Sequence, residues 1–203
     1  MGWGRAKLGL SARRTTLQIG VVMSSIIYES QVVDTNGKTV EVLLDTDPLN
    51  PRHDWEHDSL MLCFHRRYTL GDTNTGYNEG DFDNWQEVYD QLRLDDYQTI
   101  LALYLYDHSG ISISARSFLG RAPHAEWDSG QVGFIAHKEA GMESLLESEV
   151  KEYDHYLTGE VYAYRVYEKT KCESCHHEDE EVYEYCGGYY SVLDALNAGK
   201  EVA

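Results

Sequence analysis

A tight turn between two strand-like runs is the feature that most constrains the fold of this chain. Residues 31–34 lead through Asn36-Gly37 into residues 39–44, where Val40 and Val42 stand at alternate positions. Asn-Gly supplies the positive φ angles that a two-residue hairpin turn needs. Strands joined by so short a turn pair antiparallel, because a parallel pair needs a long crossover connection. The sequence therefore predicts an antiparallel sheet.

Two further pairs of runs have the same form. Residues 99–106 are the most apolar strand candidate, and a four-residue turn ending in Gly110 separates them from residues 111–114. We expect Gly110 to take a positive φ in that turn. Residues 160–168 and 181–186 are rich in Val and Tyr and are interpreted as partners across a polar loop.

Helix signals occur at three places. Asn50 and Pro51 fit the N-cap and first position of a short helix. Asp83 is followed three residues later by a glutamine, which predicts that Asp83 caps a second helix. Residues 139–157 carry the apolar stripe of the longest helix, and Gly159 is placed to end it.

The order of these elements indicates the fold class. Buried strands are also expected at residues 60–65 and 131–136, so strands and helices are interspersed without the regular alternation of a parallel sheet. The 203 residues, 42% of them hydrophobic, fit one core. We predict a single α+β domain over residues 23–203, with a mainly antiparallel sheet and two or three packed helices. Residues 1–22 show neither helical nor strand periodicity. They are interpreted as a disordered or wrongly assigned leader.

The charge is unevenly distributed along the chain. Residues 1–22 hold four basic and no acidic side chains, which leaves 13 basic against 35 acidic, or −22, for the rest. Such a body repels nucleic acid and anionic membranes, and it favours partners with a basic surface. Plain solubility, DNA mimicry toward a host defence enzyme and adaptation to high salt all remain open as reasons for the acidity.

Segments that cross a membrane or direct secretion are not expected. No run of eighteen apolar residues occurs, and no compact apolar stretch leads from the basic start to a small-residue cleavage site. The four cysteines are few for this length and do not indicate an oxidising compartment. They are expected to be thiols or metal ligands.

A zinc site is predicted in the polar loop before the last strand. Cys172 and Cys175 are separated by two residues, His177 lies beside them, and Cys186 follows. Two thiolates, an imidazole and one more donor can hold Zn²⁺ tetrahedrally, so the four residues are a candidate structural site. The alternative is a solvated loop tip without metal.

A second histidine pattern is interpreted as chance. His53-Asp54-Trp55-Glu56-His57 fits the H-x-x-E-H pattern of a metallopeptidase family. A real site needs a long helix and a third ligand, whereas only a short helix fits before the strand at residues 60–65.

Four segments together resemble a known family. They are residues 45–52 (DTDPLNPR), 63–72 (CFHRRYTLGD), 103–110 (LYLYDHSG) and 127–134 (WDSGQVGF). In order and spacing they are similar to a family of small proteins of tailed phages and prophages, over residues 28–190. The resemblance implies a viral origin and a shared fold, and it assigns no activity and no catalytic residue. It also implies a start near Met23.

Polar residues at the predicted strand ends form the candidate site. They are His65, Arg66, Arg67, Asp107, His108 and Asp128. If the strand ends meet, a paired arginine suits a carboxylate or a phosphate. The alternative is that the arginines form ion pairs with neighbouring acids such as Asp72. Adjacent residues on a turn cannot form a catalytic triad, so Asp107-His108-Ser109 is not interpreted as one.

These observations lead to two hypotheses for function. The first is a viral accessory protein in the cytoplasm of the infected host cell, which binds a protein with a basic surface and acts as an acidic inhibitor of a host defence or nucleic-acid enzyme. The second is a small enzyme that uses the histidine, arginine and aspartate cluster on a phosphorylated or nucleotide substrate. A virion component is a third option that the acidity does not specifically favour.

Overall fold

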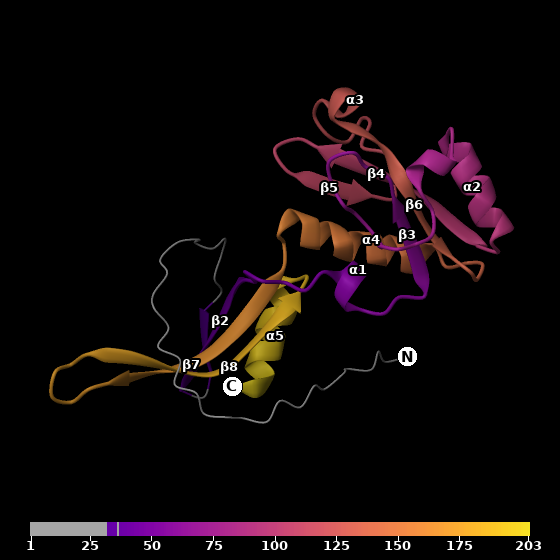
Figure 1. The fold of residues 1–203 in the computed structure, drawn as a ribbon. Coiled ribbons are helices and arrows are strands. Elements are labelled where there is room, and N and C mark those ends of the chain that lie inside the picture. Colours follow the sequence, from indigo (N-terminus) through magenta and orange to yellow (C-terminus); the bar gives the residue numbers. More distant parts are fainter. Residues whose placement is uncertain (1–31, 36) are drawn as a thin grey trace.

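The computed structural model describes residues 32–35 and 37–203, and its strands form two four-stranded sheets in which every pairing is antiparallel. The sheets and their helices form a single α+β domain, which confirms the predicted fold class. The interpretation of residues 1–22 as a leader lies outside the described residues. Figure 1 shows the two sheets at opposite ends of the molecule.

The larger core surrounds one of these sheets, in which the strand order is β3-β6-β4-β5. Its strands are β3 (Ser59–Cys63), β4 (Thr99–Asp107), β5 (Ile111–Ser114) and β6 (Ser129–His137). Two helices cover it, α2 (Trp85–Leu94) and α4 (Glu143–Thr158). Before α2 lies the short 3₁₀ helix η1 (Glu79–Asp81).

Alternating side chains of these strands build a core on each face. Met61 and Ile135 belong to the cluster that α4 completes with Leu146, Val150 and Tyr153. Their neighbours Leu62 and Phe134 belong to the cluster that α2 completes with Val88 and Leu92. Successive residues of a strand point to opposite faces, so this sheet is buried on both sides.

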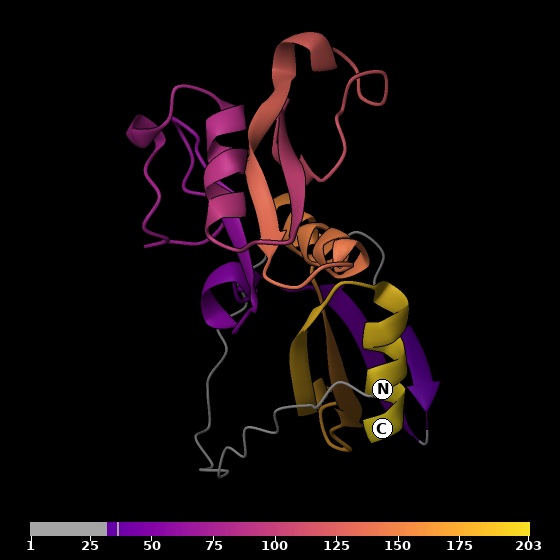
Figure 2. The same cartoon turned by 90° about the vertical axis from the view of Figure 1, so that its right-hand side faces the viewer.

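The second sheet has the order β1-β2-β7-β8. Its strands are β1 (Val32–Thr35), β2 (Lys38–Leu44), β7 (Tyr162–Lys171) and β8 (Glu178–Tyr189). The C-terminal helix α5 (Val192–Val202) lies along it and packs on Val40, Val42, Tyr164 and Val166 (Figure 2). A Cβ on Gly199 would lie 2.5 Å from Cγ1 of Val40, so only glycine allows this close approach.

A one-turn helix and two aromatic contacts connect the sheets. In α1 (Pro51–Asp54), the side chain of Arg52 is 1% exposed and donates to Asp72 at 2.8 Å and to Glu149 of α4 at 2.8 Å. The ring of Tyr190, just after β8, packs 5.8 Å from His155 of α4 and 6.2 Å from Trp55. The connection therefore has a buried ionic part and an aromatic part.

The last two strands extend beyond the rest of their sheet. β2 pairs with β7 only as far as Tyr167, and residues 168–171 pair with residues 178–181 alone. We call residues 168–181 the arm. Residues 169–181 are all exposed, and Figure 1 shows the arm projecting from the sheet.

Several local predictions are confirmed. Thr35 pairs with Lys38 across the predicted two-residue turn, and Gly37 has a φ of 83°. Asn50 caps α1 by accepting from the backbone N–H of Arg52, with proline at the first turn. Gly159 ends α4 in the left-handed conformation.

Three local details differ from the predictions. Asn84, not Asp83, caps α2, because its side chain accepts from the N–H groups of Gln86 and Glu87. In the β4–β5 turn, Ser109 has the positive φ of 62°, and Gly110 does not. The start of α4 is Glu143 because Thr99 binds the carbonyl of Glu139 and the N–H of Met142, which holds the preceding residues in a turn.

Candidate functional site

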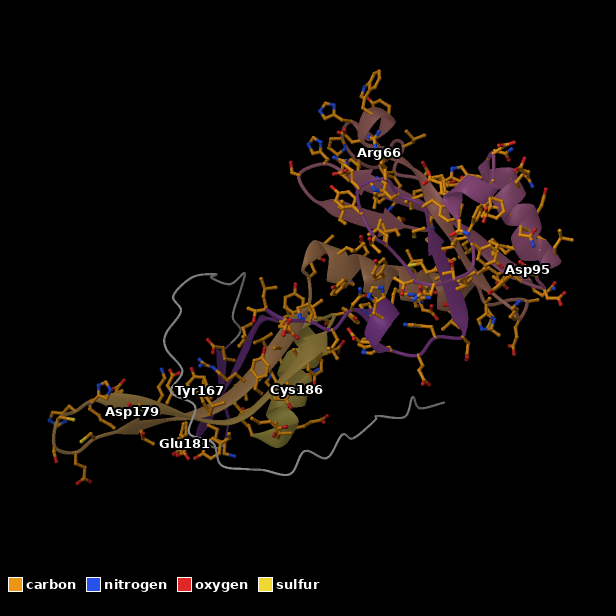
Figure 3. The ribbon with its side chains drawn as sticks, viewed as in Figure 1. Arg66, Asp95, Tyr167, Asp179, Glu181 and Cys186 are labelled. Atoms are coloured by element: carbon orange, nitrogen blue, oxygen red, sulfur yellow. The ribbon has the colours of Figure 1, made fainter. Side chains whose placement is uncertain are left out.

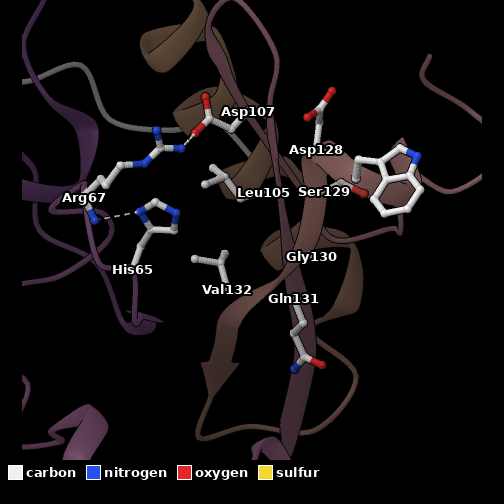
Figure 4. Close-up of a pocket in the computed structure, with 10 residues that line it drawn as sticks. His65, Arg67, Leu105, Asp107, Asp128, Ser129, Gly130, Gln131 and Val132 are labelled. Carbon is white, nitrogen blue, oxygen red and sulfur yellow. Dashed lines mark hydrogen bonds and ion pairs between the residues drawn. The ribbon is translucent and has the colours of Figure 1, made fainter. Parts of the chain in front are cut away.

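A pocket of about 260 Å³ lies where the ends of β3, β4 and β6 meet. The loop after β3, the end of β4 and the one-turn helix α3 (Ala125–Asp128) form its walls. Its lining residues are His65, Arg67, Leu105, Asp107, Trp127, Asp128, Ser129, Gly130, Gln131 and Val132 (Figure 4). Six of the ten lie within β4 or β6, so the sheet sets their positions.

His65 is oriented by the backbone that follows it. Its Nδ1 lies 3.2 Å from the backbone nitrogens of Arg67 and of Tyr68, which donate to it. Its ring also stacks on Tyr68, with 4.9 Å between the centroids. Because Nδ1 accepts these bonds, the neutral ring carries its proton on Nε2. Nε2 has no partner among the described residues and is the nitrogen open to a ligand.

Arg67 is held by an acid rather than presented to a ligand. Its guanidinium forms an ion pair with Asp107, which also accepts from the hydroxyl of Tyr68 at 3.3 Å. The Arg67 side chain is 59% exposed, so its guanidinium reaches the pocket from the solvent side (Figure 4). The charge of each partner is largely compensated by the other.

His108 and Asp128 form a second side-chain pair. Nδ1 of His108 lies 2.8 Å from Oδ2 of Asp128. The ring of His108 stacks between Tyr106, at 5.8 Å, and His124, at 5.9 Å. The pair therefore connects the β4–β5 turn to α3, and Asp128 alone of the two lines the pocket.

The structure brings together four of the six candidate residues, namely His65, Arg67, Asp107 and Asp128. Arg66 is exposed and lies outside the lining, without an ion pair among the described residues (Figure 3). The alternative pairing of Arg66 or Arg67 with Asp72 does not occur, because Asp72 is bound by Arg52.

Trp127 is one of six lining residues that were not predicted as part of the site. Trp127 lines the pocket while its side chain is 84% exposed, which is unusual for an indole. Its position directly before Asp128 was the signal that could have identified it. An exposed indole beside a pocket offers a planar surface for an aromatic or apolar ligand.

The four residues predicted to bind zinc are not gathered in one place. Cys172, Cys175 and His177 lie at the tip of the arm, whereas Cys186 pairs with Tyr164 at its base. The tip and the position of Cys186 are seven residues apart along β7, which corresponds to roughly 23 Å. Within the described residues, no group of three or more His, Cys, Asp or Glu side chains is placed to hold a metal ion. Cys186 is therefore not placed beside the other three residues of the predicted set.

The H-x-x-E-H pattern does not form a metal pair either. α1 ends at Asp54, so His53 and His57 are not on one helical face. His57 lies against the carbonyl of Pro51, and His53 lies 3.4 Å from the side chain of Asn50.

The arm includes the segment that was interpreted as a polar loop, but β7 continues to Lys171 and β8 begins at Glu178. Its charged residues are six acids, Glu168, Glu173, Glu178, Asp179, Glu180 and Glu181, and two lysines, Lys169 and Lys171. The run of four acids at residues 178–181 was the available signal. At the base of the arm, Val182, Tyr183 and Tyr185 are each about half exposed.

No family model, curated protein or solved structure matches this chain. In the part of the chain that the structure describes, no helix has both the length and the apolar character to cross a membrane. Evidence on function therefore comes from the pocket and from the arm.

Proposed function

We propose that this chain is a viral accessory protein that acts by binding a protein with a basic surface, and that the arm makes this contact. The projecting arm, which is exposed throughout residues 169–181 and has six acids against two lysines, is the observation that carries the proposal. A host defence or nucleic-acid enzyme is the proposed partner, since such enzymes have the basic grooves that complement this charge. The infected-cell cytoplasm is the proposed location.

The arm has a second property that suits a protein partner. β8 is the edge strand of its sheet, so one side of its backbone has unpaired N–H and C=O groups. Tyr183 and Tyr185 on the same strand are exposed, and tyrosine is enriched at protein interfaces. Apolar contact area, backbone groups and negative charge thus occur together on one strand.

The charged side chains of the pocket favour binding over catalysis, because they are already paired with each other. Its arginine is paired with Asp107, and His108 is paired with Asp128. A site for a phosphorylated substrate would leave its cations unpaired until the substrate arrives.

The test is a capture experiment with matched variants. The tagged full chain is incubated with host lysate, and the captured protein is identified, purified and titrated against three forms of the chain. The arm variant neutralises four acids by Glu178→Gln, Asp179→Asn, Glu180→Gln and Glu181→Gln. The control neutralises four exposed acids without ion pairs among the described residues, by Glu56→Gln, Glu126→Gln, Glu139→Gln and Glu201→Gln.

We expect the arm variant to bind at least about tenfold more weakly, because electrostatic complementarity steers and orients the partner. The control variant should bind like the unaltered chain, and binding should weaken as salt screens the arm. Equal losses in both variants would assign the effect to net charge alone. Capture that survives the arm variant would refute the role of the arm.

A second candidate function rests on the pocket, where Nε2 of His65, the indole of Trp127 and the rim guanidinium of Arg67 lie together. This combination suits a nucleotide, whose base would stack on the indole and whose phosphate would compete with Asp107 for the guanidinium of Arg67. The check is titration with nucleoside phosphates, read by tryptophan fluorescence. Arg67→Gln should remove binding, whereas Arg116→Gln, another exposed and acid-paired arginine, should not.

A further inference from the structure

The tip of the arm is a tight turn with defined backbone hydrogen bonds. The N–H of Cys172 donates to the carbonyl of His177 at 2.9 Å, and the N–H of His176 donates to the carbonyl of Cys172 at 2.9 Å. His176 has a φ of 59°, which reverses the chain within the turn. Because Cys172 and Cys175 lie inside this turn, their relative position is set by the backbone.

The turn places both thiols at the exposed tip of the arm. The thiolate is the form that binds a soft metal ion.

Among the described residues, no group of three or more His, Cys, Asp or Glu side chains is placed to hold a metal ion, so one tip does not complete a metal site. Cys186 is roughly 23 Å away along the strand, and His177 pairs with Asp179 at 3.3 Å. A structural zinc ion takes four ligands, and tetrahedral sets of four thiolates are common. The two thiols of one tip are half the number of ligands that such a set needs.

We propose that one Zn²⁺ joins the arm tips of two copies of this chain, through Cys172 and Cys175 of each. The four thiols release four protons as they bind the ion, and nothing is oxidised or reduced. A twofold axis through the metal makes the two halves equivalent, as in most homodimers. This inference does not depend on the proposed function.

The shape and charge of the arm determine how the copies meet. Residues 169–181 are exposed, and the arm projects from its sheet, so two tips can approach without contact between the two cores (Figure 1). Each arm has a formal charge of −4, from six acids and two lysines. The two arms therefore repel each other, and added salt should favour the zinc-bridged dimer.

The experiment uses the full chain, kept reduced with a phosphine, and Zn²⁺ alone as the probe. Metal content is measured after removal of free ion, and mass in solution is measured by light scattering. We expect one ion per two chains and a doubling of the mass that a chelator reverses. Co²⁺ in place of Zn²⁺ should give the absorption of tetrahedral thiolate ligation.

Two variants and one control separate the tip from other cysteines. Cys172→Ser and Cys175→Ser should each abolish the mass doubling, while Cys186→Ser should retain it. One ion per chain without a change in mass would overturn the bridging, and so would metal binding that persists in Cys172→Ser. Because these variants leave the acids in place, they should still capture the partner of the arm, which keeps the two proposals distinguishable.

Discussion

The two sheets are built from similar antiparallel hairpins, but they differ in how much of each is buried. The sheet of β3, β6, β4 and β5 has a core on both faces, completed by α2 and α4. In the sheet of β1, β2, β7 and β8, the buried cluster is confined to the part that α5 covers, and the arm beyond it is exposed. Burial supplies folding free energy, whereas an exposed strand contributes little to it. We infer that the first sheet stabilises the fold and that the arm is available for recognition.

The largest expected effect is at the buried ion pair of the connection. Arg52→Met keeps the apolar stem of the side chain but leaves Asp72 and Glu149 without their cation. Losing one partner of a buried ion pair destabilises by about 3–5 kcal/mol, so the free energy of unfolding in urea should fall by that amount. Arg67→Met is the control, because its exposed pair with Asp107 should contribute less than about 1 kcal/mol. Equal losses of unfolding free energy in Arg52→Met and Arg67→Met would contradict the expected difference between the buried and the exposed ion pair.

The core of the first sheet gives the next effect. Leu146 of α4 is fully buried, so Leu146→Ala should lower the free energy of unfolding by about 3 kcal/mol through lost transfer energy and a cavity. Val182→Thr at the base of the arm keeps a β-branched side chain on an exposed strand. It should change the free energy of unfolding by less than about 0.5 kcal/mol. A large loss in Val182→Thr would show that the arm helps to hold the fold.

A pH dependence distinguishes the buried core from the exposed arm. Burial raises the pKa of Cys63 to about 12 from its ordinary value of 9.0, and nearby Asp72 adds to the rise. The folded state therefore keeps the thiol proton more tightly than the unfolded state, and stability falls as pH rises between these two values. Cys63→Ser does not titrate in this range. The stability difference between the unaltered chain and Cys63→Ser, from urea unfolding, should shrink by on the order of 1 kcal/mol between about pH 8 and about pH 10.

The control for this pH dependence lies at the exposed tip. Cys175→Ser should leave the alkaline dependence of unfolding unchanged, because Cys175 is exposed in the folded chain. If the stability of Cys63→Ser still falls as pH rises, other groups cause the loss of stability at alkaline pH. Buried Tyr153, with a pKa raised to about 12, is such a group.

Elements with strong local signals were predictable. The Asn36-Gly37 turn, the Asn50 cap and the Gly159 end depend on backbone preferences within a few residues, and the structure confirms each. Helix α5 was missed although Ser191 caps it, with the side chain accepting from the N–H of Asp194. Its packing depends on Gly199 lying against Val40, 159 residues earlier, and a local pattern does not reveal such a contact.

The candidate site was predictable in location but not in pairing. His65, Arg67 and Asp107 converge because antiparallel strands bring their ends together, as the sequence order suggested. The choice of partner was not predictable, since Asp72 binds Arg52 rather than an arginine five or six residues before it. A long basic side chain can reach several acids in the folded chain, and their distance along the sequence does not determine which one it pairs with.

The smallest expected effect concerns a pair of like charges in the arm. Glu168 and Glu181 are directly opposite each other in the β7–β8 ladder, and like charges in this position destabilise a sheet. Glu181→Lys makes the pair attractive and should strengthen the arm by about 0.5 kcal/mol, measured by hydrogen exchange of its backbone amides. Glu181→Gln should give a smaller gain of the same sign.

Glu181→Lys is also expected to weaken capture of the basic partner. A substitution that stabilises the arm and weakens binding is the most direct test of the difference between the buried sheet and the arm. Residues that serve folding improve stability and function together, whereas residues kept for recognition often oppose stability. If Glu181→Lys protects the amides and reduces binding, the like-charge pair is retained for recognition, in contrast to the Arg52 cluster, where charges are paired for stability. If it protects the amides and leaves binding unchanged, the acids of the arm serve solubility only, because net charge far from zero keeps a protein dispersed wherever that charge lies.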